Sequence, residues 1–266
     1  MEMFLAPDER SLYVLTHEPR ALVSISLEDL RVEWKLPLTE EPVTATLASD
    51  GRTVAISSAG NVRLVDLGAR AIGPPLGQGD FGAVRFLKGD QTLIAANRGD
   101  RRLSLYDVAS RRLITHLPIS VRPDQLCFNR DLGQLFVTGE GMDAVVVVYP
   151  FYTPEVAKTV LAGHAPGAMA TSEKLLFVAS PRSGDVSILN VATHRVIAVV
   201  QVGSDPGFVT VTPDDLYALV LNRSSGDVAV LSVPTIESNR NRYKSAAFLT
   251  VIPVGSRPVS ATVRAV

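Results

Sequence analysis

The sequence predicts an all-β fold assembled from repeated units of four antiparallel strands. An apolar run returns at steps of 39 to 43 residues, and its copies begin at Leu12, Thr53, Thr92, Leu135, Leu176 and Leu216. The apolar runs are short and are bounded by Gly, Pro, Asp and Asn, which is typical of strands and turns. No stretch keeps the apolar spacing of a helix over three turns. A period of about 40 residues is typical of β-propellers, in which each four-stranded blade buries its faces against its neighbours.

The four strands of a blade are clearest in the fifth and sixth repeats. In the sixth repeat, Phe208–Thr212, Leu216–Val220 and Asp227–Val233 are the first, second and third strands. The fourth strand is clearest as Arg195–Gly203, a β-branched run that ends at a glycine. Second, third and fourth strands are each expected six times. First strands are expected seven times, at Met3–Ala6, Val43–Ala48, Ala83–Leu87, Gln125–Asn129, Ala168–Thr171, Phe208–Thr212 and Val259–Val263.

Two kinds of turn recur between these strands. Turns rich in Asp, Gly and Pro are predicted as tight hairpins between first and second strands, at Pro7–Arg10, Ser49–Arg52, Lys88–Gln91 and Thr212–Asp215. Turns with a glycine that can adopt positive φ are predicted between second and third strands, at Arg98–Asp100, Ser183–Asp185 and Ser225–Asp227. The prolines in Gly73–Pro75 predict that the fourth strand of the second repeat is an edge strand.

Three segments of the fifth repeat carry a resemblance to a known family. They are Leu175–Ala179, Ser183–Asn190, and Arg195–Gly203 followed by Ser204, Asp205 and Pro206. With these segments the chain resembles the YVTN-type β-propellers, which include bacterial YncE-like and surface-layer-like proteins with seven blades. The resemblance extends over nearly the whole chain and is weakest around Ala69–Gly82. It implies a periplasmic or extracellular location if the N-terminus is truncated, because relatives of this type are often extracytoplasmic.

The ends of the chain leave the number of blades open. Six blades are complete, and Val259–Val263 is left over as a lone C-terminal first strand. The resemblance implies that this strand closes a seventh blade whose other strands precede Met1 in a longer product, and we favour this interpretation. The alternative is a six-bladed ring in which Val259–Val263 displaces or abuts Met3–Ala6.

The composition fits one all-β domain over residues 1–266. Hydrophobic residues make up 46% of the chain and charged residues 20%, with a net charge of −1. This balance indicates an ordinary core and argues against a nucleic-acid partner or membrane insertion. No apolar run is long enough to span a membrane, and the segment after Met1 turns polar at Asp8 without resembling a leader. Cys127 is expected to be a small core residue, and the compartment stays open.

Motifs for cofactors and metals are absent from the sequence. The four histidines fall in four different repeats, without the close spacing of a metal site. Gly77–Gly82 superficially resembles a nucleotide-binding loop, but it joins two strands and precedes no helix. No Gly-x-Ser-x-Gly elbow supports a hydrolase triad. We therefore expect neither a cofactor nor a metal ion.

Charged residues near the entrances of the blades are the candidate ligand-binding residues. A propeller would gather them at the mouth of its channel, with Arg98 and Arg223 further out. Arginine forks suit carboxylate or phosphate groups, so the mouth could bind a small anionic ligand. The alternative is that these residues solvate turns or form weak surface ion pairs. The candidates are Glu41, Arg122, His164, Asp205 and Arg257.

The opposite face holds two departures from the repeat, and both are candidate contacts for a protein partner. Phe151 and Tyr152 place adjacent aromatic rings in a connection that is short and polar elsewhere, and aromatic residues are enriched in interfaces. The loop Pro234–Ala247 is longer than its counterparts and contains Arg240, Arg242 and Tyr243. Such a loop is either mobile or functional.

Two classes of function are compatible with these features. The first is a non-catalytic binding or protein-interaction scaffold whose partner is another protein or a small anionic ligand. The second is implied by the resemblance, because related seven-bladed propellers include lactonases and the large subunits of quinoprotein amine dehydrogenases. A lactonase-like hydrolase would place its site at the channel mouth. The sequence favours the binding scaffold.

Overall fold

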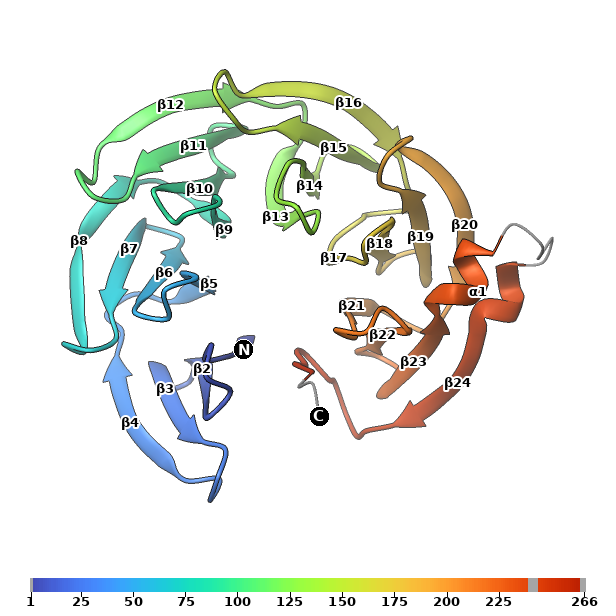
Figure 1. The fold of residues 1–266 in the computed structure, drawn as a ribbon, viewed down its shortest axis with the longest axis horizontal. Helices are drawn as coiled ribbons and strands as arrows, with labels where there is room; N and C mark the ends of the chain where they lie inside the picture. The colour runs from blue at the N-terminus through green and yellow to red at the C-terminus, as the bar shows by residue number, and fades with distance from the viewer. Residues whose placement is uncertain (1, 239–243, 264–266) are drawn as a thin grey trace. The chain divides into compact units, whose positions relative to one another are not determined.

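A computed structural model of the protein describes residues 2–238 and 244–263. These residues form six sheets, each of four antiparallel strands in sequence order. The chain divides into two compact units, Met1–Asp124 and Gln125–Val266. The fold is thus an all-β propeller of six four-stranded blades, with three blades in each unit (Figure 1).

The first unit contains twelve strands in three blades. The first blade is β1 (Glu2–Leu5), β2 (Ser11–His17), β3 (Arg20–Ser26) and β4 (Val32–Pro37). The second blade is β5 (Pro42–Leu47), β6 (Thr53–Ser58), β7 (Asn61–Asp66) and β8 (Ala71–Gln78). The third blade is β9 (Phe81–Phe86), β10 (Thr92–Asn97), β11 (Arg102–Asp107) and β12 (Leu113–Pro118).

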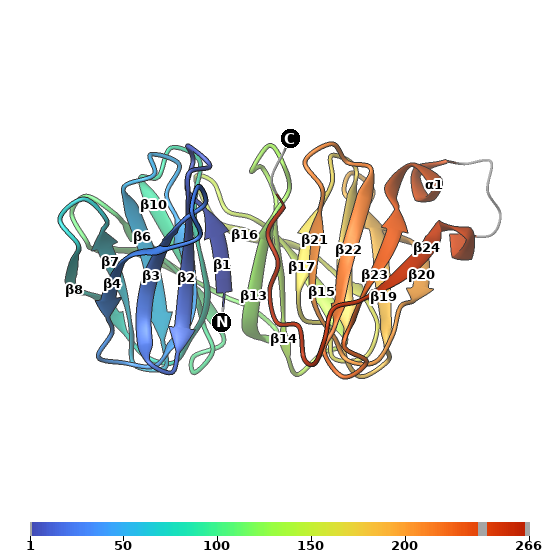
Figure 2. The ribbon, with the colours of Figure 1, turned by 90° about the horizontal axis from the view of Figure 1, so that it is seen from below.

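The described residues of the second unit form the other three blades and two short helices (Figure 2). The fourth blade is β13 (Arg122–Phe128), which begins just before the unit boundary, β14 (Leu135–Glu140), β15 (Ala144–Tyr149) and β16 (Glu155–Leu161). The fifth blade is β17 (Met169–Thr171), β18 (Leu175–Ser180), β19 (Asp185–Asn190) and β20 (Arg195–Gln201). The sixth blade is β21 (Pro206–Val211), β22 (Tyr217–Asn222), β23 (Asp227–Ser232) and β24 (Phe248–Pro253), with α1 (Val233–Glu237) and the 3₁₀ helix η1 (Lys244–Ala247) between its last two strands.

Apolar side chains between adjacent blades form the cores of both units. Along a strand, successive side chains point to opposite faces, so an apolar second or third strand can pack against the blades on both sides. In the second unit, Leu175 and Phe177 of β18 share one cluster with Val220 and Leu231 of the sixth blade. In the first unit, Leu15 and Leu22 of the first blade pack with the second blade in the same way. This explains why β18 is buried at all six of its residues.

The structure confirms six of the predicted first strands, with bounds that differ by at most three residues. It also confirms β8 as an edge strand, where the register with β7 shifts twice near the prolines. The expected strand at Val259–Val263 is not formed, because residues 254–263 have no regular secondary structure. A strand requires a hydrogen-bonded partner, and β24 is already the last strand of the sixth blade. The described residues of the predicted long loop are not all irregular, because they include most of α1 and all of η1.

In the fifth and sixth blades, the turn between the second and third strands depends on glycine. Gly184 and Gly226 adopt φ of +70° and +72°. A Cβ at Gly184 would lie 2.8 Å from the backbone oxygen of Gly203, and a Cβ at Gly226 would lie 2.7 Å from that of Gly255. The corresponding turn of the third blade is built differently, because its positive φ belongs to Arg101 and not to Gly99.

Adjacent blades are joined by a side-chain contact that occurs between the second and third blades and again between the fifth and sixth. Asp90 of the third blade accepts the backbone N–H of Ser49 at 2.8 Å. Asp215 of the sixth blade accepts the backbone N–H of Glu173 at 2.9 Å and also pairs with Arg130. Each carboxylate accepts a hydrogen bond from a turn N–H group of the preceding blade. Within the strand ladders that N–H group has no partner.

Candidate functional site

The β10–β11 turn, Asp80 just before β9 and the start of β13 form an ion-pair cluster in the first unit. Arg98 donates through two nitrogens to Asp124, with Nε at 2.7 Å, and its Nη1 lies 3.5 Å from Asp80. Arg122 donates to the same Asp80 at 2.8 Å. Two guanidinium groups therefore alternate with two carboxylates, so the charges of this cluster are balanced.

Glu41 lies near basic residues of the first blade. Its carboxylate is 3.7 Å from His17 Nδ1 and 3.9 Å from Arg20 Nη2, and its side chain is 65% exposed. At these distances the contacts are loose surface ion pairs, which contribute little to stability.

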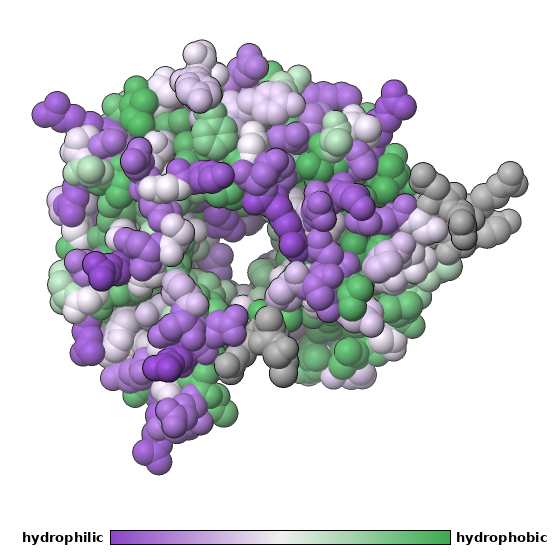
Figure 3. All heavy atoms as spheres, in the orientation of Figure 1, coloured by the Kyte–Doolittle hydropathy of each residue, from purple (hydrophilic) through white to green (hydrophobic). Residues whose placement is uncertain are grey.

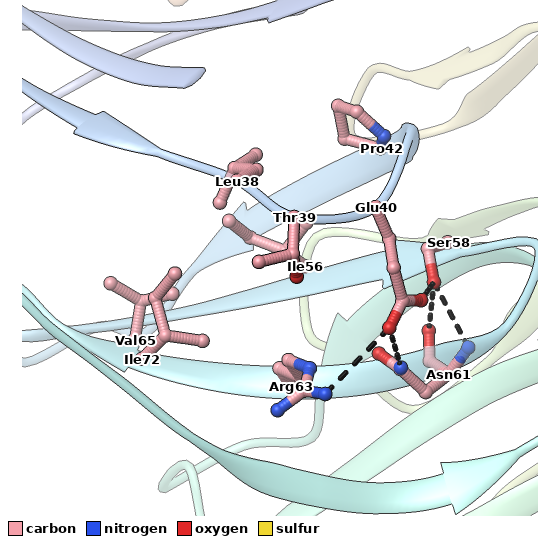
Figure 4. Close-up of a pocket in the computed structure, with 10 residues that line it drawn as sticks. All are labelled: Leu38, Thr39, Glu40, Pro42, Ile56, Ser58, Asn61, Arg63, Val65 and Ile72. Atoms are coloured by element: carbon pink, nitrogen blue, oxygen red, sulfur yellow. Dashed lines mark hydrogen bonds and ion pairs between the residues drawn. The ribbon is translucent and has the colours of Figure 1, made fainter. Parts of the chain in front are cut away.

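Glu40, the neighbour of Glu41, lines a small cavity together with nine other residues of the first and second blades (Figure 4). It accepts a hydrogen bond from Ser58 Oγ at 2.7 Å and one from Asn61, and it lies 3.6 Å from Arg63. The Ser58 hydroxyl, with Asn61 and Arg63, holds the pKa of Glu40 below its ordinary value of 4.5 even though burial opposes this shift. The cavity volume of about 30 Å³ suits a water molecule or two and excludes a substrate.

Glu40 should make folding sensitive to acid. Because its pKa is lowered by folding, its stabilising contribution is present above pH 4.5 and is lost as the pH falls through the lower folded value. We expect Glu40→Gln to be less stable than the wild type at pH 7, and we expect this difference to shrink below pH 4.5. Urea unfolding at pH 7, 5, 4 and 3 would measure it. Glu41→Gln is the matched control, and an equal loss in both variants would contradict the role of Glu40.

In the second unit, His164 is paired with a residue that the sequence did not single out. His164 Nδ1 lies 2.9 Å from Asp143 Oδ2, and the other oxygen of Asp143 accepts the backbone N–H of Ala165 at 2.9 Å. The Ala165 N–H, together with His164, lowers the pKa of the Asp143 carboxyl group. The His164 backbone N–H also donates to Ser183 Oγ at 3.1 Å. These contacts hold the connection between β16 and β17 against two neighbouring turns.

An open hollow of about 620 Å³ lies beside the β22–β23 turn in the second unit. The segment after β24 forms its other wall, and both segments can be followed in Figure 2. The volume lies within the range of small-molecule sites. The lining residues are Arg223, Ser224, Ser225, Gly226, Pro253, Gly255, Ser256 and Arg257.

Backbone contacts fix Arg223 at the edge of this hollow. Its guanidinium packs so closely on Gly207 that a Cβ there would lie 2.2 Å from Arg223 Nε. Its Nη2 donates to the Gly207 carbonyl oxygen at 3.1 Å, and its backbone N–H donates to the Asp205 carbonyl oxygen at 2.9 Å. The Asp205 carboxylate accepts from Ser224 Oγ at 3.4 Å. Asp205 is thus linked through Ser224 to the lining of the hollow.

Arg257 is the second arginine of the hollow. It adopts a φ of +55° and its side chain is exposed. In the part of the chain that the structure describes, Arg257 has no hydrogen-bond or ion-pair partner. The hollow therefore presents two guanidinium groups, one of them without an acceptor among the described residues, and both can bind an anion.

The aromatic candidates are only partly accessible, and the candidates of the long loop lie outside the described residues. Tyr152 is fully exposed, whereas Phe151 is half-buried. Arg240, Arg242 and Tyr243 belong to residues 239–243, which the structure does not describe. Apolar surface lies over the sixth blade (Figure 3). The exposed apolar side chains in and just after β24 are Leu249, Val251, Ile252 and Val254.

The described residues contain neither a cluster of metal ligands nor a membrane-spanning helix. Over residues 2–238 and 244–263, His, Cys, Asp and Glu side chains do not gather in any group of three that could hold a metal ion. In the same ranges, no helix has the length and apolar character needed to cross a membrane.

Neither a protein-family model nor a curated protein matches the sequence. Solved structures do match in fold. A candidate 6-phosphogluconolactonase from Bacteroides fragilis has a TM-score of 0.77 at 16% identity, over 97% of this chain and 85% of that chain. Hydrazine synthase from Kuenenia stuttgartiensis has a TM-score of 0.75 at 17% identity, over 87% and 82%. A protein of unknown function from Desulfotomaculum acetoxidans has a TM-score of 0.75 at 17% identity, over 91% and 80%. At these identities the similarity shows the fold alone.

Proposed function

We propose that this chain is a non-catalytic binding scaffold, and that the hollow between Arg223 and Arg257 binds a small anionic ligand. The observation that supports it is this pair of arginines at one opening of about 620 Å³. Arg223 is held in place by Gly207, so less side-chain entropy is lost when a ligand binds. Arg257 offers a guanidinium fork that no described side chain occupies.

The other predicted site residues have partners of their own. Arg122 is paired with Asp80, and His164 with Asp143. Glu41 lies beside His17 and Arg20. We do not propose the lactonase-like alternative, because no observation favours an acid or base beside a reacting group over these local pairs. We further propose that residues 1–266 form one domain of the YVTN type, as the sequence resemblance implies.

Removing one arginine tests this function. We expect wild-type protein to bind at least one of three anions, namely inorganic phosphate, glycerol 3-phosphate and N-acetylalanine, and Arg257→Ala to weaken that binding at least tenfold. NMR titration of the ¹⁵N-labelled protein would measure both affinities and show whether the amides of residues 223–226 and 255–257 respond. Arg195→Ala is the matched control, because Arg195 is an exposed arginine at the start of β20 in the same unit. Equal binding by the wild type and Arg257→Ala would contradict the proposal, as would no binding of any anion.

A further inference from the structure

The chain contains two copies of the same arrangement of loops, one in each unit. In the third blade, Arg98 donates its backbone N–H to the Asp80 carbonyl oxygen at 2.8 Å. In the sixth blade, Arg223 donates its backbone N–H to the Asp205 carbonyl oxygen at 2.9 Å. Each arginine follows an asparagine that ends the second strand of its blade. The two arginines therefore occupy equivalent positions of the repeat.

The segments that follow the fourth strands are equivalent as well. The backbone N–H of Ile119 donates to the turn of the third blade at 3.0 Å, and that of Val254 donates to the turn of the sixth blade at 3.1 Å. Arg122 lies three residues after Ile119, and Arg257 lies three residues after Val254, so the two arginines occupy equivalent positions of the repeat. Each is followed by a proline. The next residue is Asp124 in the first copy and Val259 in the second. One carboxylate of the first copy is thus missing from the second.

The loss of this carboxylate changes the charge at the four compared positions. In the first copy, Asp124 accepts two hydrogen bonds from Arg98, and Asp80 accepts one from Arg122. Across the four equivalent positions of the second copy, two arginines remain beside the one carboxylate of Asp205. These four positions carry one positive charge in excess, and the hollow beside them is lined by two arginines and by no acidic residue.

We infer that the ligand of the hollow carries a carboxylate group, which takes the role that the Asp124 side chain has in the first copy. This inference rests on the proposed function and names its ligand class: a small carboxylic acid. A planar carboxylate matches the fork of a guanidinium, and one negative charge balances the excess in the hollow. Around the carboxylate, the open volume leaves room for a polar body that the hydroxyls of Ser225 and Ser256 can contact.

The sharpest test supplies the missing carboxylate from the protein itself. We expect Val259→Asp to weaken binding of N-acetylalanine at least tenfold, because the new side chain competes for the arginines from within the chain. The asparagine of Val259→Asn has nearly the same size as aspartate but no charge. This variant should bind N-acetylalanine with an affinity within twofold of the wild type. Val259 is 40% exposed and lies outside the strands, so both variants should keep the fold, which their thermal unfolding would check. Val259→Glu provides a second variant with a longer reach.

A matched pair of probes tests the ligand itself. N-acetylalanine and N-acetylalaninamide differ in one group, and only the acid carries a charge. We expect NMR titration of the wild type to show binding of the acid at least tenfold tighter than that of the amide. Equal binding of the two probes, or full binding of the acid by Val259→Asp and Val259→Glu, would overturn the inference. If glycerol 3-phosphate binds at the hollow and N-acetylalanine does not, the ligand class is wrong while the anion site stands. If no anion binds the wild type, the site itself is wrong.

Discussion

We expect Phe177→Ala to lower the free energy of unfolding by about 3–5 kcal/mol. Phe177 is fully buried in the middle of β18, within the cluster that joins the fifth and sixth blades. Removing its ring takes apolar area out of the core and leaves a cavity that strands on both sides keep from collapsing. This loss is a large share of the stability of an ordinary domain, which is about 5–15 kcal/mol. Urea unfolding followed by circular dichroism would measure it.

The matched control is Val199→Ala on the edge strand of the same blade. Val199 is 55% exposed, so its truncation creates no buried cavity. It should change the free energy of unfolding by less than about 1 kcal/mol. Trp34 is the single tryptophan of the chain and lies in β4 of the first unit. Its fluorescence separately reports whether that unit loses stability together with the second. Equal midpoints for Phe177→Ala and Val199→Ala would contradict the core role of β18.

The sequence predicted the blades because each repeat carries its own strand and turn chemistry. The positions of Phe177 and its counterparts follow from an apolar run that recurs at nearly constant spacing. Gly184 and Gly226 mark turns that only a residue tolerant of positive φ can close without strain. The expected strand at Val259–Val263 does not form among the described residues, because recurrence of a first-strand segment shows where a strand can form, and a strand also needs a partner.

The candidate site was harder to predict because the partners of its side chains come from different repeats. Sequence spacing identified Arg122 and Asp205 as loop residues, but it did not show that Arg122 pairs with Asp80, 42 residues earlier. It also missed Asp143 as the partner of His164. The serines of the hollow resemble ordinary turn residues. The signal that could have identified the hollow is the comparison of Asp124 with Val259, which becomes meaningful once equivalent loops are aligned by their hydrogen bonds.

We expect Gly82→Ala to destabilise the first unit by about 2–3 kcal/mol. A Cβ at Gly82 would lie 2.6 Å from the backbone oxygen of Asp124 and 2.9 Å from its Cα. These atoms belong to the backbone at the start of β13, so no side-chain rotation can relieve the clash. The strand must move, and the carboxylate of Asp124 moves with it, away from Arg98. The variant should therefore lose packing and ion pairing at the same point.

The direction of this effect distinguishes the clash from the general effect of replacing glycine. Gly82 does not adopt positive φ, so alanine would otherwise stabilise the fold by about 0.4–1 kcal/mol through a less flexible unfolded chain. Gly99→Ala is the control, because its Cβ would meet nothing closer than 3.8 Å, and it should be neutral or slightly stabilising. Urea unfolding of both variants, followed by Trp34 fluorescence, compares them within the same unit. If Gly82→Ala is as stable as Gly99→Ala, β13 moves at little cost in free energy. The contact between Gly82 and Asp124 would then not be what holds Asp124 beside Arg98.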